Sequence, residues 1–573
     1  MRHLLDILSD ELKRAFRECG YDDAKVSVTV SNRPDLCEYQ CNGAMALAKE
    51  AHKAPFVIAE EVAAKLAGSE YFSKTECVKP GFINLNISDG YLASYIAEQA
   101  EAEKYGLEPG KSESVVVDYG GPNVAKPLHI GHLRAAIIGE AVKRLSKYTG
   151  NKTLGDIHMG DWGLQIGLII AEMQERGMDR MPTLEELSEI YPAASARSKE
   201  DEAYKEKAMD ITYKLQHGDE EYLRIWRHIM DISVADLKAN YDKLNVSFEI
   251  WKGEADADPY IAPMVERMKK EGYAYGSQGA LVVDVSEESD AKEIPPCMIL
   301  KSDGAALYTT TDLATLVQRE EDYKPDSVIY VVDKRQDMHF LQVFRAAKKC
   351  GIVPEETRLE FLGFGTMNGK DGKPFKTRSG GVMKLQELID DVYQRCYERM
   401  KENGAEMSEG ELADTAAKIG LAAIKYGDLS NEARKDYIFD IDKFTSFEGN
   451  TGPYVLYTIV RIKSILRKYK ESGGRQEGLK ILAPANAAEK AMMMSLTGFA
   501  PMIEGAWRDL APHRICAYIY QVANDFNKFY HETKIITEED RQKQESWIAL
   551  LTLTKGILES CIDILGFEAP EKM

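Results

Sequence analysis

Two histidines lie three residues apart at a predicted strand-to-helix junction. They are His129 and His132 in the segment KPLHIGHLRAAIIG, residues 126–139. The preceding SVVVDYGG is a β-branched run that ends in glycines, which is typical of a strand followed by a turn. Apolar residues then recur every four positions, which predicts a helix that ends near Gly150. They are Leu133, Ile137, Ala141 and Leu145.

This junction suits the binding of an anion. The start of a helix that follows a strand offers free N–H groups and a partial positive charge, and ligands of doubly wound sheets collect at that edge. Imidazoles can donate hydrogen bonds to phosphate oxygens, and Gly131 lets a base or phosphate approach the backbone. The alternative is that both histidines only cap the helix. The HExxH spacing and third ligand of a zinc site are missing, and we expect no bound metal.

The chain has 573 residues and divides into three predicted domains. Residues 1–110 mix an amphipathic helix with β-rich stretches and predict a small α/β domain. Residues 111–435 alternate helices with the strand-like runs SVVVDY, ALVVDV, SVIYVVD and LEFLGFGTM, which predicts a doubly wound, Rossmann-type parallel sheet. A charged helical insertion at 195–245 is expected to pack on it. Residues 436–573 show helical patterns that predict an α-helical bundle.

Composition narrows the classes of function. The net charge of −20 argues against a non-specific nucleic-acid binder, although local basic patches could still hold a selective RNA. Nine scattered cysteines predict reduced thiols. The N-terminal residues predict an amphipathic helix rather than a signal peptide, and no apolar run reaches the ~18 residues of a membrane span. We therefore expect a cytoplasmic protein without a membrane partner.

Five segments, in order, resemble the bacterial arginyl-tRNA synthetases, a family of class I aminoacyl-tRNA synthetases. They are GGPNVAKPLHIGHLRAAIIG, HMGDWGLQIG, LYTTTDLA, DKRQDMHF and PHRICAYIYQVANDFNKFYH. One HxGH tetrapeptide is weak evidence for the family, but five different family segments in the right order are strong evidence. The resemblance covers the chain from the N-terminal domain to the last residue. It implies an arginine–tRNA ligase that activates L-arginine with ATP, taken as its Mg²⁺ complex, and charges tRNA(Arg). We expect a monomer.

The resemblance implies roles for the HIGH segment and for a second loop. His129, Gly131 and His132 would bind ATP, and both histidines would act in catalysis. Class I enzymes usually carry a KMSKS loop whose second lysine stabilises the leaving phosphates. The corresponding residues 369–381 read GKDGKPFKTRSGG, with Thr377 in place of that lysine.

Other cations are expected to supply the missing charge. The resemblance implies that Lys126, just before the HIGH motif, takes this catalytic role, and it leaves Lys376 and Arg378 as ATP-binding candidates in the loop. The alternative for Lys126 is an ordinary surface lysine, and the alternative for the loop is a solvated basic hairpin.

A guanidinium is bound most strongly by carboxylates that lie in its plane. The resemblance assigns arginine binding to Asn123, His129, Glu254, Tyr308, Asp312 and Gln336. Asn123 would hold the α-amino or carboxylate end of the amino acid. Each residue has a structural alternative: Asp312 could serve a helix cap, and Glu254 or Asn123 could be turn residues.

The C-terminal region carries aromatic and basic residues that suit RNA. Five basic residues and no acid lie between Arg461 and Lys470. The resemblance assigns this region to the anticodon and the N-terminal domain to the tRNA elbow. The tRNA-binding candidates are Asn84, Asn86, Tyr454, Arg461 and Asn524. The alternative explanations are that the aromatic residues belong to the core of the bundle and that the basic run is a solvated face.

Two rival functions fit parts of the chain. Small-molecule nucleotidyltransferases share HxGH, but they are much shorter and lack a helical RNA-binding end. A non-catalytic synthetase relative could act as an RNA-binding or regulatory module, yet the intact His129, His132, Tyr308 and Asp312 argue against it. The altered loop and the RNA-facing domains on both sides of the sheet further predict that activation waits for the tRNA.

Overall fold

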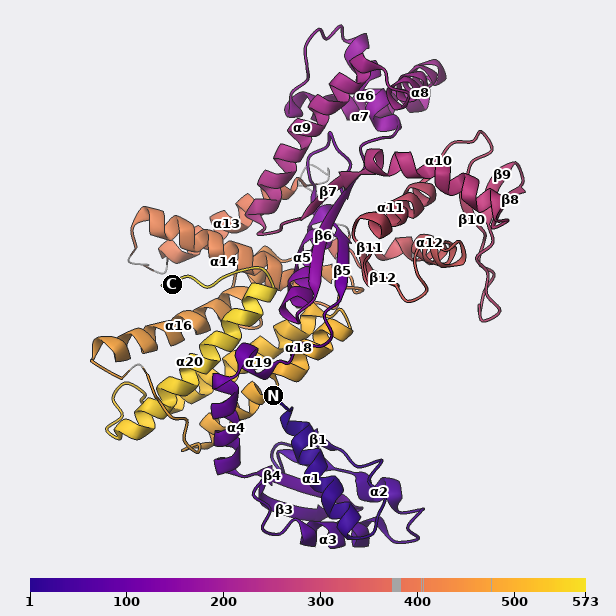
Figure 1. Cartoon of the computed structure of the whole chain (residues 1–573). Coiled ribbons are helices and arrows are strands. Elements are labelled where there is room, and N and C mark those ends of the chain that lie inside the picture. The colour runs from indigo at the N-terminus through magenta and orange to yellow at the C-terminus, as the bar shows by residue number, and fades with distance from the viewer. Residues whose placement is uncertain (374–382, 403, 405–406, 476) are drawn as a thin grey trace.

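The computed structural model describes residues 1–373, 383–402, 404, 407–475 and 477–573. A small N-terminal unit lies at one end of the molecule and the parallel sheet with its covering helices at the other. The C-terminal helices lie between them (Figure 1).

The N-terminal unit is a four-stranded antiparallel sheet, in the order β1-β2-β4-β3, covered by helices. The predicted amphipathic helix forms, and its apolar side chains Leu4, Leu8 and Leu12 are buried. The elements are α1 (Leu4–Glu18), β1 (Val28–Val30), β2 (Tyr39–Cys41), α2 (Gly43–Leu47), α3 (Pro55–Lys65), β3 (Phe72–Val78), β4 (Phe82–Ile87), α4 (Asp89–Glu101) and the 3₁₀ turn η1 (Glu103–Gly106).

The central sheet has five parallel strands in the order β12-β11-β5-β6-β7. Val117 at its centre is aligned with Ile329 on one side and Gly155 on the other. The chain moves outward from β5 in both directions, so a crevice opens beside β5 at the carboxyl ends of the strands. The strands are β5 (Ser114–Tyr119), β6 (Lys152–Met159), β7 (Ile250–Gly253), β11 (Ser327–Asp333) and β12 (Arg358–Phe364).

The doubly wound sheet is confirmed, but one predicted strand belongs elsewhere. The ALVVDV run forms β9 (Ala280–Val283), which pairs antiparallel with β8 (Ala274–Ser277) and β10 (Cys297–Leu300) in a separate sheet. The sequence reading also missed β6 and β7. An apolar run indicates a strand but not its partner, because pairing depends on distant residues.

Helices cover the sheet and form the insertion. The predicted insertion corresponds to α7–α9, which pack on one another and on α6, the helix that follows β6. Helix α5 begins directly after the HIGH segment. The helices are α5 (Leu133–Tyr148), α6 (Leu164–Glu175), α7 (Leu184–Glu200), α8 (Glu202–Gln216), α9 (Glu220–Lys243), α10 (Glu254–Lys270), α11 (Tyr308–Asp322) and α12 (Asp337–Lys349), with the 3₁₀ turns η2 (Ile130–His132) and η3 (Lys334–Gln336).

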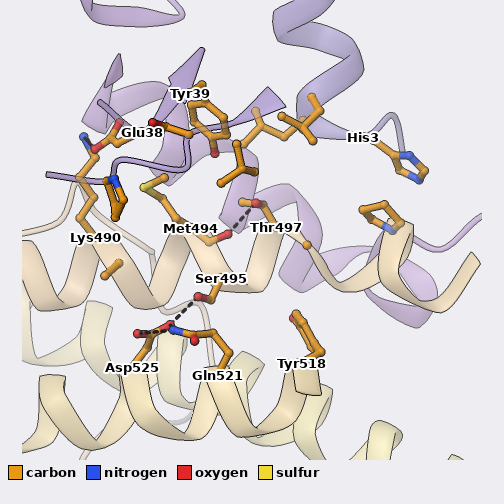
Figure 2. Close-up of a pocket in the computed structure, with 18 of the residues that line it drawn as sticks. His3, Glu38, Tyr39, Lys490, Met494, Ser495, Thr497, Tyr518, Gln521 and Asp525 are labelled. Carbon is orange, nitrogen blue, oxygen red and sulfur yellow. Dashed lines mark hydrogen bonds and ion pairs between the residues drawn. The ribbon is translucent and has the colours of Figure 1, made fainter. Parts of the chain in front are cut away.

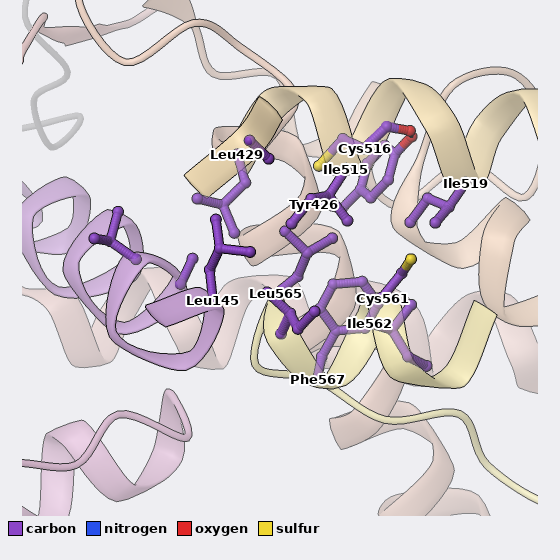
Figure 3. Packing of buried hydrophobic residues seen from close by; sticks show 14 of the residues in the cluster. Leu145, Tyr426, Leu429, Ile515, Cys516, Ile519, Cys561, Ile562, Leu565 and Phe567 are labelled. Carbon is purple, nitrogen blue, oxygen red and sulfur yellow. The ribbon is translucent and has the colours of Figure 1, made fainter. Parts of the chain in front are cut away.

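Beyond residue 440, every regular element in the described part of the chain is a helix, as predicted. Leu145 of α5 packs with Tyr426, Ile515 and Leu565 in one continuous core (Figure 3). The last elements are β13 (Met367–Asn368), α13 (Leu385–Glu402), α14 (Glu409–Leu429), β14 (Tyr437–Ile438), α15 (Ile441–Phe444), α16 (Gly452–Glu471), α17 (Ala487–Thr497), α18 (Phe499–Arg508), α19 (Pro512–Glu532) and α20 (Arg541–Ile564). The helix that starts at the HIGH segment therefore shares its core with the C-terminal bundle.

Candidate active site

The two HIGH histidines form a hydrogen-bonded turn at the carboxyl end of β5. The Gly131 N–H donates to His129 Nδ1 at 3.0 Å, and the His129 N–H donates to His132 Nδ1 at 3.1 Å. The ring centroids are 3.9 Å apart. A Cβ at position 131 would lie 2.8 Å from the His129 ring, so any larger residue there would displace that ring.

These backbone donors determine the tautomer of both rings. Each Nδ1 accepts a backbone N–H, so each neutral ring carries its proton on Nε2. Burial lowers the pKa of His129, and the neighbouring Lys126 charge adds to the effect. Burial lowers the pKa of His132 to about 3. Both rings therefore present a neutral Nε2–H donor at neutral pH.

Two other segments hold the backbone before and between the histidines. The Val124 N–H donates to the carbonyl oxygen of Gly160, beyond β6, at 3.1 Å. The Ile130 N–H donates to the Met383 carbonyl oxygen, also at 3.1 Å. Met383 directly follows the loop whose candidates Lys376, Thr377 and Arg378 lie outside the described residues. The stem of that loop is thus joined to the HIGH segment.

Lys126 lines a pocket of about 460 Å³ beside His129. Its ammonium lies 4.1 Å from the centre of the Tyr191 ring on α7. Two more lysines line the pocket, Lys199 on α7 and Lys384 next to Met383. No carboxylate is among the described residues that line it. Cations beside an apolar wall suit a phosphate-bearing group, and the sequence reading missed Lys199 and Lys384.

The carboxylates predicted for the guanidinium lie at the same edge of the sheet. Glu254 begins α10 directly after β7, and Asp312 lies one turn after Tyr308 at the start of α11. Burial raises the pKa of Glu254, an effect that His158 opposes and the Asp312 charge reinforces. Tyr308 is 75% exposed, but partial desolvation of its hydroxyl raises its pKa, and the Glu254 charge adds to the effect. The three predicted residues are therefore neighbours, although they come from two helices.

A histidine that the sequence reading did not assign holds one of these carboxylates. His339 Nε2 lies 2.5 Å from Asp312 Oδ2, and both side chains are about a quarter exposed. By contrast, Glu254 has no ion-pair partner among the described residues. His339 lies in the segment DKRQDMHF, so the signal was present, but no local rule pairs it with Asp312.

The other two arginine-site candidates are exposed, as Tyr308 is. Asn123 lies in the loop after β5, and its backbone pairs with Gly160. Gln336 ends η3 at the carboxyl end of β11. Both therefore lie at the edge of the sheet that carries Glu254 and Asp312.

A buried arginine ties the strands together beneath this edge. Arg319 of α11 donates to Asp156 of β6 at 2.7 and 3.0 Å, to Tyr330 of β11 at 3.0 Å and to Asp118 of β5. Both carboxylates therefore have a hydrogen-bonded counter-charge. The network fixes the relative positions of the strands that end at the site.

The C-terminal tRNA candidates form one connected network on α16 and α19. The Tyr454 hydroxyl donates to Asn524 Oδ1 at 2.7 Å. Arg461 donates to Asn527 Oδ1 at 2.7 Å, and its guanidinium lies 4.6 Å from the centre of the Tyr457 ring. These side chains are partly exposed and held in place by one another.

The N-terminal candidates lie on β4. Asn84 is 5% exposed, and its amide oxygen accepts a hydrogen bond from Gln40 at 2.8 Å. Asn86 is more exposed. Their contacts with tRNA stay a prediction, and Asn84 already has a structural partner.

Among the described residues, no group of three or more His, Cys, Asp or Glu side chains could hold a metal ion. Within the same residues, no helix is long and apolar enough to cross a membrane.

Comparisons with known proteins place the chain in a family. Three family models match successive parts of the chain: the arginyl tRNA synthetase N terminal domain at residues 2–87, the class I (R) tRNA synthetase catalytic domain at 96–441 and the DALR anticodon binding domain at 455–573. The arginine–tRNA ligase of Agathobacter rectalis is 56% identical to the chain, and that of Alkaliphilus oremlandii is 51% identical, with 100% of both chains covered in each case.

The chain belongs to the arginyl-tRNA synthetase family. Two solved arginyl-tRNA synthetases share its fold over 100% of both chains: that of Plasmodium falciparum with a TM-score of 0.84 at 24% identity, and that of Thermus thermophilus with 0.80 at 22%. The predicted class I fold and function as an arginine–tRNA ligase are confirmed, and no comparison supports the non-catalytic alternative.

Proposed function

We propose that this arginyl-tRNA synthetase performs its chemistry in the crevice beside β5. The observation that carries the proposal is the meeting of Glu254, Tyr308 and Asp312 at the sheet edge where His129 and His132 present their Nε2–H donors. Two carboxylates suit a guanidinium, and two neutral donors suit a phosphate.

In the first step, an oxygen of the arginine carboxylate attacks the α-phosphorus of ATP and pyrophosphate leaves. His129 and His132 donate to phosphate oxygens, and Gly131 lets the nucleotide approach the backbone. Catalysis of such a step is mainly positioning and electrostatics. Since both rings are neutral in the free enzyme, they act as fixed dipoles before ATP arrives. In the second step, a ribose hydroxyl of tRNA(Arg) takes the arginyl group and AMP leaves.

Lysines provide the charge for the leaving phosphates. Lys126, Lys199 and Lys384 line one acid-free pocket beside His129, which supports a role with pyrophosphate. Lys376 and Arg378 of the loop are the further ATP-binding candidates. Mg²⁺ accompanies ATP as part of the substrate.

The amino acid is selected by its guanidinium. Glu254 and Asp312 bind it, with Tyr308 beside them, and His339 keeps Asp312 oriented. Gln336 belongs to the same guanidinium pocket, and Asn123 binds the α-amino or carboxylate end of arginine. A substrate without the guanidinium leaves these part-buried carboxylates without their cationic partner, which rejects it strongly.

The two outer domains hold the tRNA. Asn84 and Asn86 belong to the N-terminal domain (1–110), and Tyr454, Arg461 and Asn524 to the helical domain (436–573). They flank the catalytic domain (111–435) and position the acceptor end. Because the loop lacks its usual lysine, bound tRNA completes the site, so that activation depends on tRNA. The enzyme acts as a cytoplasmic monomer.

The test is ATP–pyrophosphate exchange by the full-length enzyme with each of the twenty amino acids, with and without tRNA(Arg). We expect exchange with arginine alone among them, and only when tRNA is present. Robust exchange without RNA would show that the site is already complete and would refute tRNA-dependent activation. Exchange with another amino acid would refute the assignment of the carboxylate pair.

A further inference from the structure

A cavity of about 780 Å³ lies between the N-terminal unit and the C-terminal helices (Figure 2). One wall carries Leu5 of α1 and Tyr39 of β2, and the other carries Met494 of α17 and Tyr518 of α19. Its volume is within the range of small-molecule sites, roughly 300 to 1,000 Å³. None of the residues proposed above for catalysis, arginine or tRNA lines this cavity.

Asp525 provides the polar recognition group of the cavity. Its Oδ2 accepts a hydrogen bond from the Ser495 hydroxyl at 2.5 Å, and the Gln521 amide lies 3.1 and 3.0 Å from its two oxygens (Figure 2). Among the described residues, no Lys, Arg or His nitrogen lies within 4.0 Å of an Asp525 carboxylate oxygen, the limit for an ion pair. A carboxylate can accept about four hydrogen bonds. Asp525 is therefore held in place and can still accept a charged donor.

The cavity offers no matching site for an anion. Lys490 is the one lysine or arginine among its described lining residues. Its ammonium lies 2.7 Å from Glu38, 3.0 Å from Asp89 and 3.2 Å from the Ile87 carbonyl oxygen. These three acceptors use all the donors of an ammonium. His3 also lines the cavity, and its ring nitrogens lie 3.1 Å from Glu504 and 3.6 Å from Asp6. An RNA phosphate in the cavity would therefore find no unpaired basic side chain among the described lining residues and would be repelled by the carboxylates.

We propose that this cavity binds a small amphiphilic amine. Its ammonium pairs with Asp525, and the rest of the molecule, which has ~10 to ~15 non-hydrogen atoms in all, packs against Met494, Tyr518 and Leu5. Since the walls come from both RNA-facing domains, a bound amine stabilises their present arrangement. The proposal does not depend on the residue roles given under Proposed function.

The test uses tyramine as the probe and the full-length enzyme in isothermal titration calorimetry. We expect a dissociation constant of ~0.1 to ~1 mM, the affinity that a ligand of this size reaches with one good ion pair. Tyrosol, which carries a hydroxyl in place of the amine, is the matched ligand and should bind at least ~10-fold more weakly. Asp525→Asn keeps the shape of the side chain and should lower the affinity for tyramine by ~10-fold or more.

Ala491→Trp places an indole in the cavity and should abolish binding. Circular dichroism melts identify the variants that keep the fold. If Ala491→Trp does not fold, the Asp525→Asn variant and the comparison with tyrosol test the proposal without it. The proposal is overturned if tyrosol binds as well as tyramine, if Asp525→Asn binds unchanged, or if the wild-type enzyme shows no binding at ~10 mM tyramine. It is also overturned if Asp525→Asn weakens tRNA binding and leaves tyramine binding unchanged, because the carboxylate would then serve RNA.

Discussion

His339 and Asp312 lie at the starts of two different helices, with 2.5 Å between Nε2 and Oδ2. The contact holds one oxygen of the Asp312 carboxylate, and the other oxygen has no hydrogen-bond partner among the described residues, so it can accept from a ligand. His339 is therefore a positioning residue for the proposed guanidinium site.

His339→Ala should raise KM for arginine ~10-fold or more, because a charge-assisted hydrogen bond to Asp312 is lost. The kcat at saturating arginine should change much less. His339→Gln, which restores an N–H donor, should recover part of the affinity. The matched control is His228→Ala on α9, where another half-buried histidine has one hydrogen bond, 2.9 Å to the Pro182 carbonyl oxygen. A fall in kcat with unchanged KM would contradict this positioning role.

His129→Ala and His132→Ala should each lower kcat by ~100-fold or more, with a much smaller effect on arginine KM. The physical reason is that each removes a fixed Nε2–H donor from the phosphate site. Single-turnover measurements with tRNA(Arg) present separate this step from product release. Turnover close to wild type in both variants would exclude a transition-state role.

Lys126→Ala should lower the rate of activation ~100-fold if its charge replaces the missing loop lysine. Thr377→Lys in the same background should restore part of the rate. Lys199→Ala and Lys384→Ala test the other cations of the pocket. A mild effect of Lys126→Ala together with a large effect of Lys384→Ala would transfer the role to Lys384.

Arg461→Ala should weaken tRNA binding ~10-fold, since it removes both a charge and the partner of Asn527 and Tyr457. If activation waits for tRNA, then pyrophosphate exchange at sub-saturating tRNA falls in proportion to charging. Arg541→Ala, which replaces an exposed arginine of the same domain, is the control.

Point variants are required here, because deleting the bundle would expose the core around Leu145 and Leu565 (Figure 3). Loss of charging with full exchange would separate the two steps and contradict the coupling.

Lys425→Met should stabilise the folded protein by ~1 to ~3 kcal/mol at pH 7. Burial lowers the pKa of Lys425 to about 7, against an ordinary value of 10.5. Between those pH values the unfolded chain binds more protons than the folded one, so wild-type stability rises with pH in that window. The gain from methionine is therefore largest at and below pH 7 and shrinks toward pH 10.5. Urea unfolding across this range measures it.

The control for that series is Lys418→Met on the same helix. Lys418 is paired with Asp414 and Glu568, each at 3.1 Å. Its replacement should not stabilise the protein at any pH in the range. An advantage of Lys425→Met that grows as the pH rises would show that the buried amine is charged where we expect it to be neutral.

Local pattern was enough to predict the strand, turn and helix around the HIGH segment. Leu133, Ile137, Ala141 and Leu145 are fully buried, as their spacing predicted, because helix periodicity depends only on residues a few positions apart. The same holds for the first helix and for the helical end of the chain. The five motif segments then predicted the family.

Tertiary structure alone decided which distant residues meet. Glu254, Asp312 and His339 come from three helices, and Arg319 binds strands that are far apart in sequence. The ALVVDV run has the composition of a central strand, yet its partners place it in another sheet. Lys199 and Lys384 lie about 70 residues or more from Lys126 along the chain and join it only when α7 and the loop stem close on the HIGH segment. Such pairings depend on long-range packing and strand register, which local periodicity does not encode.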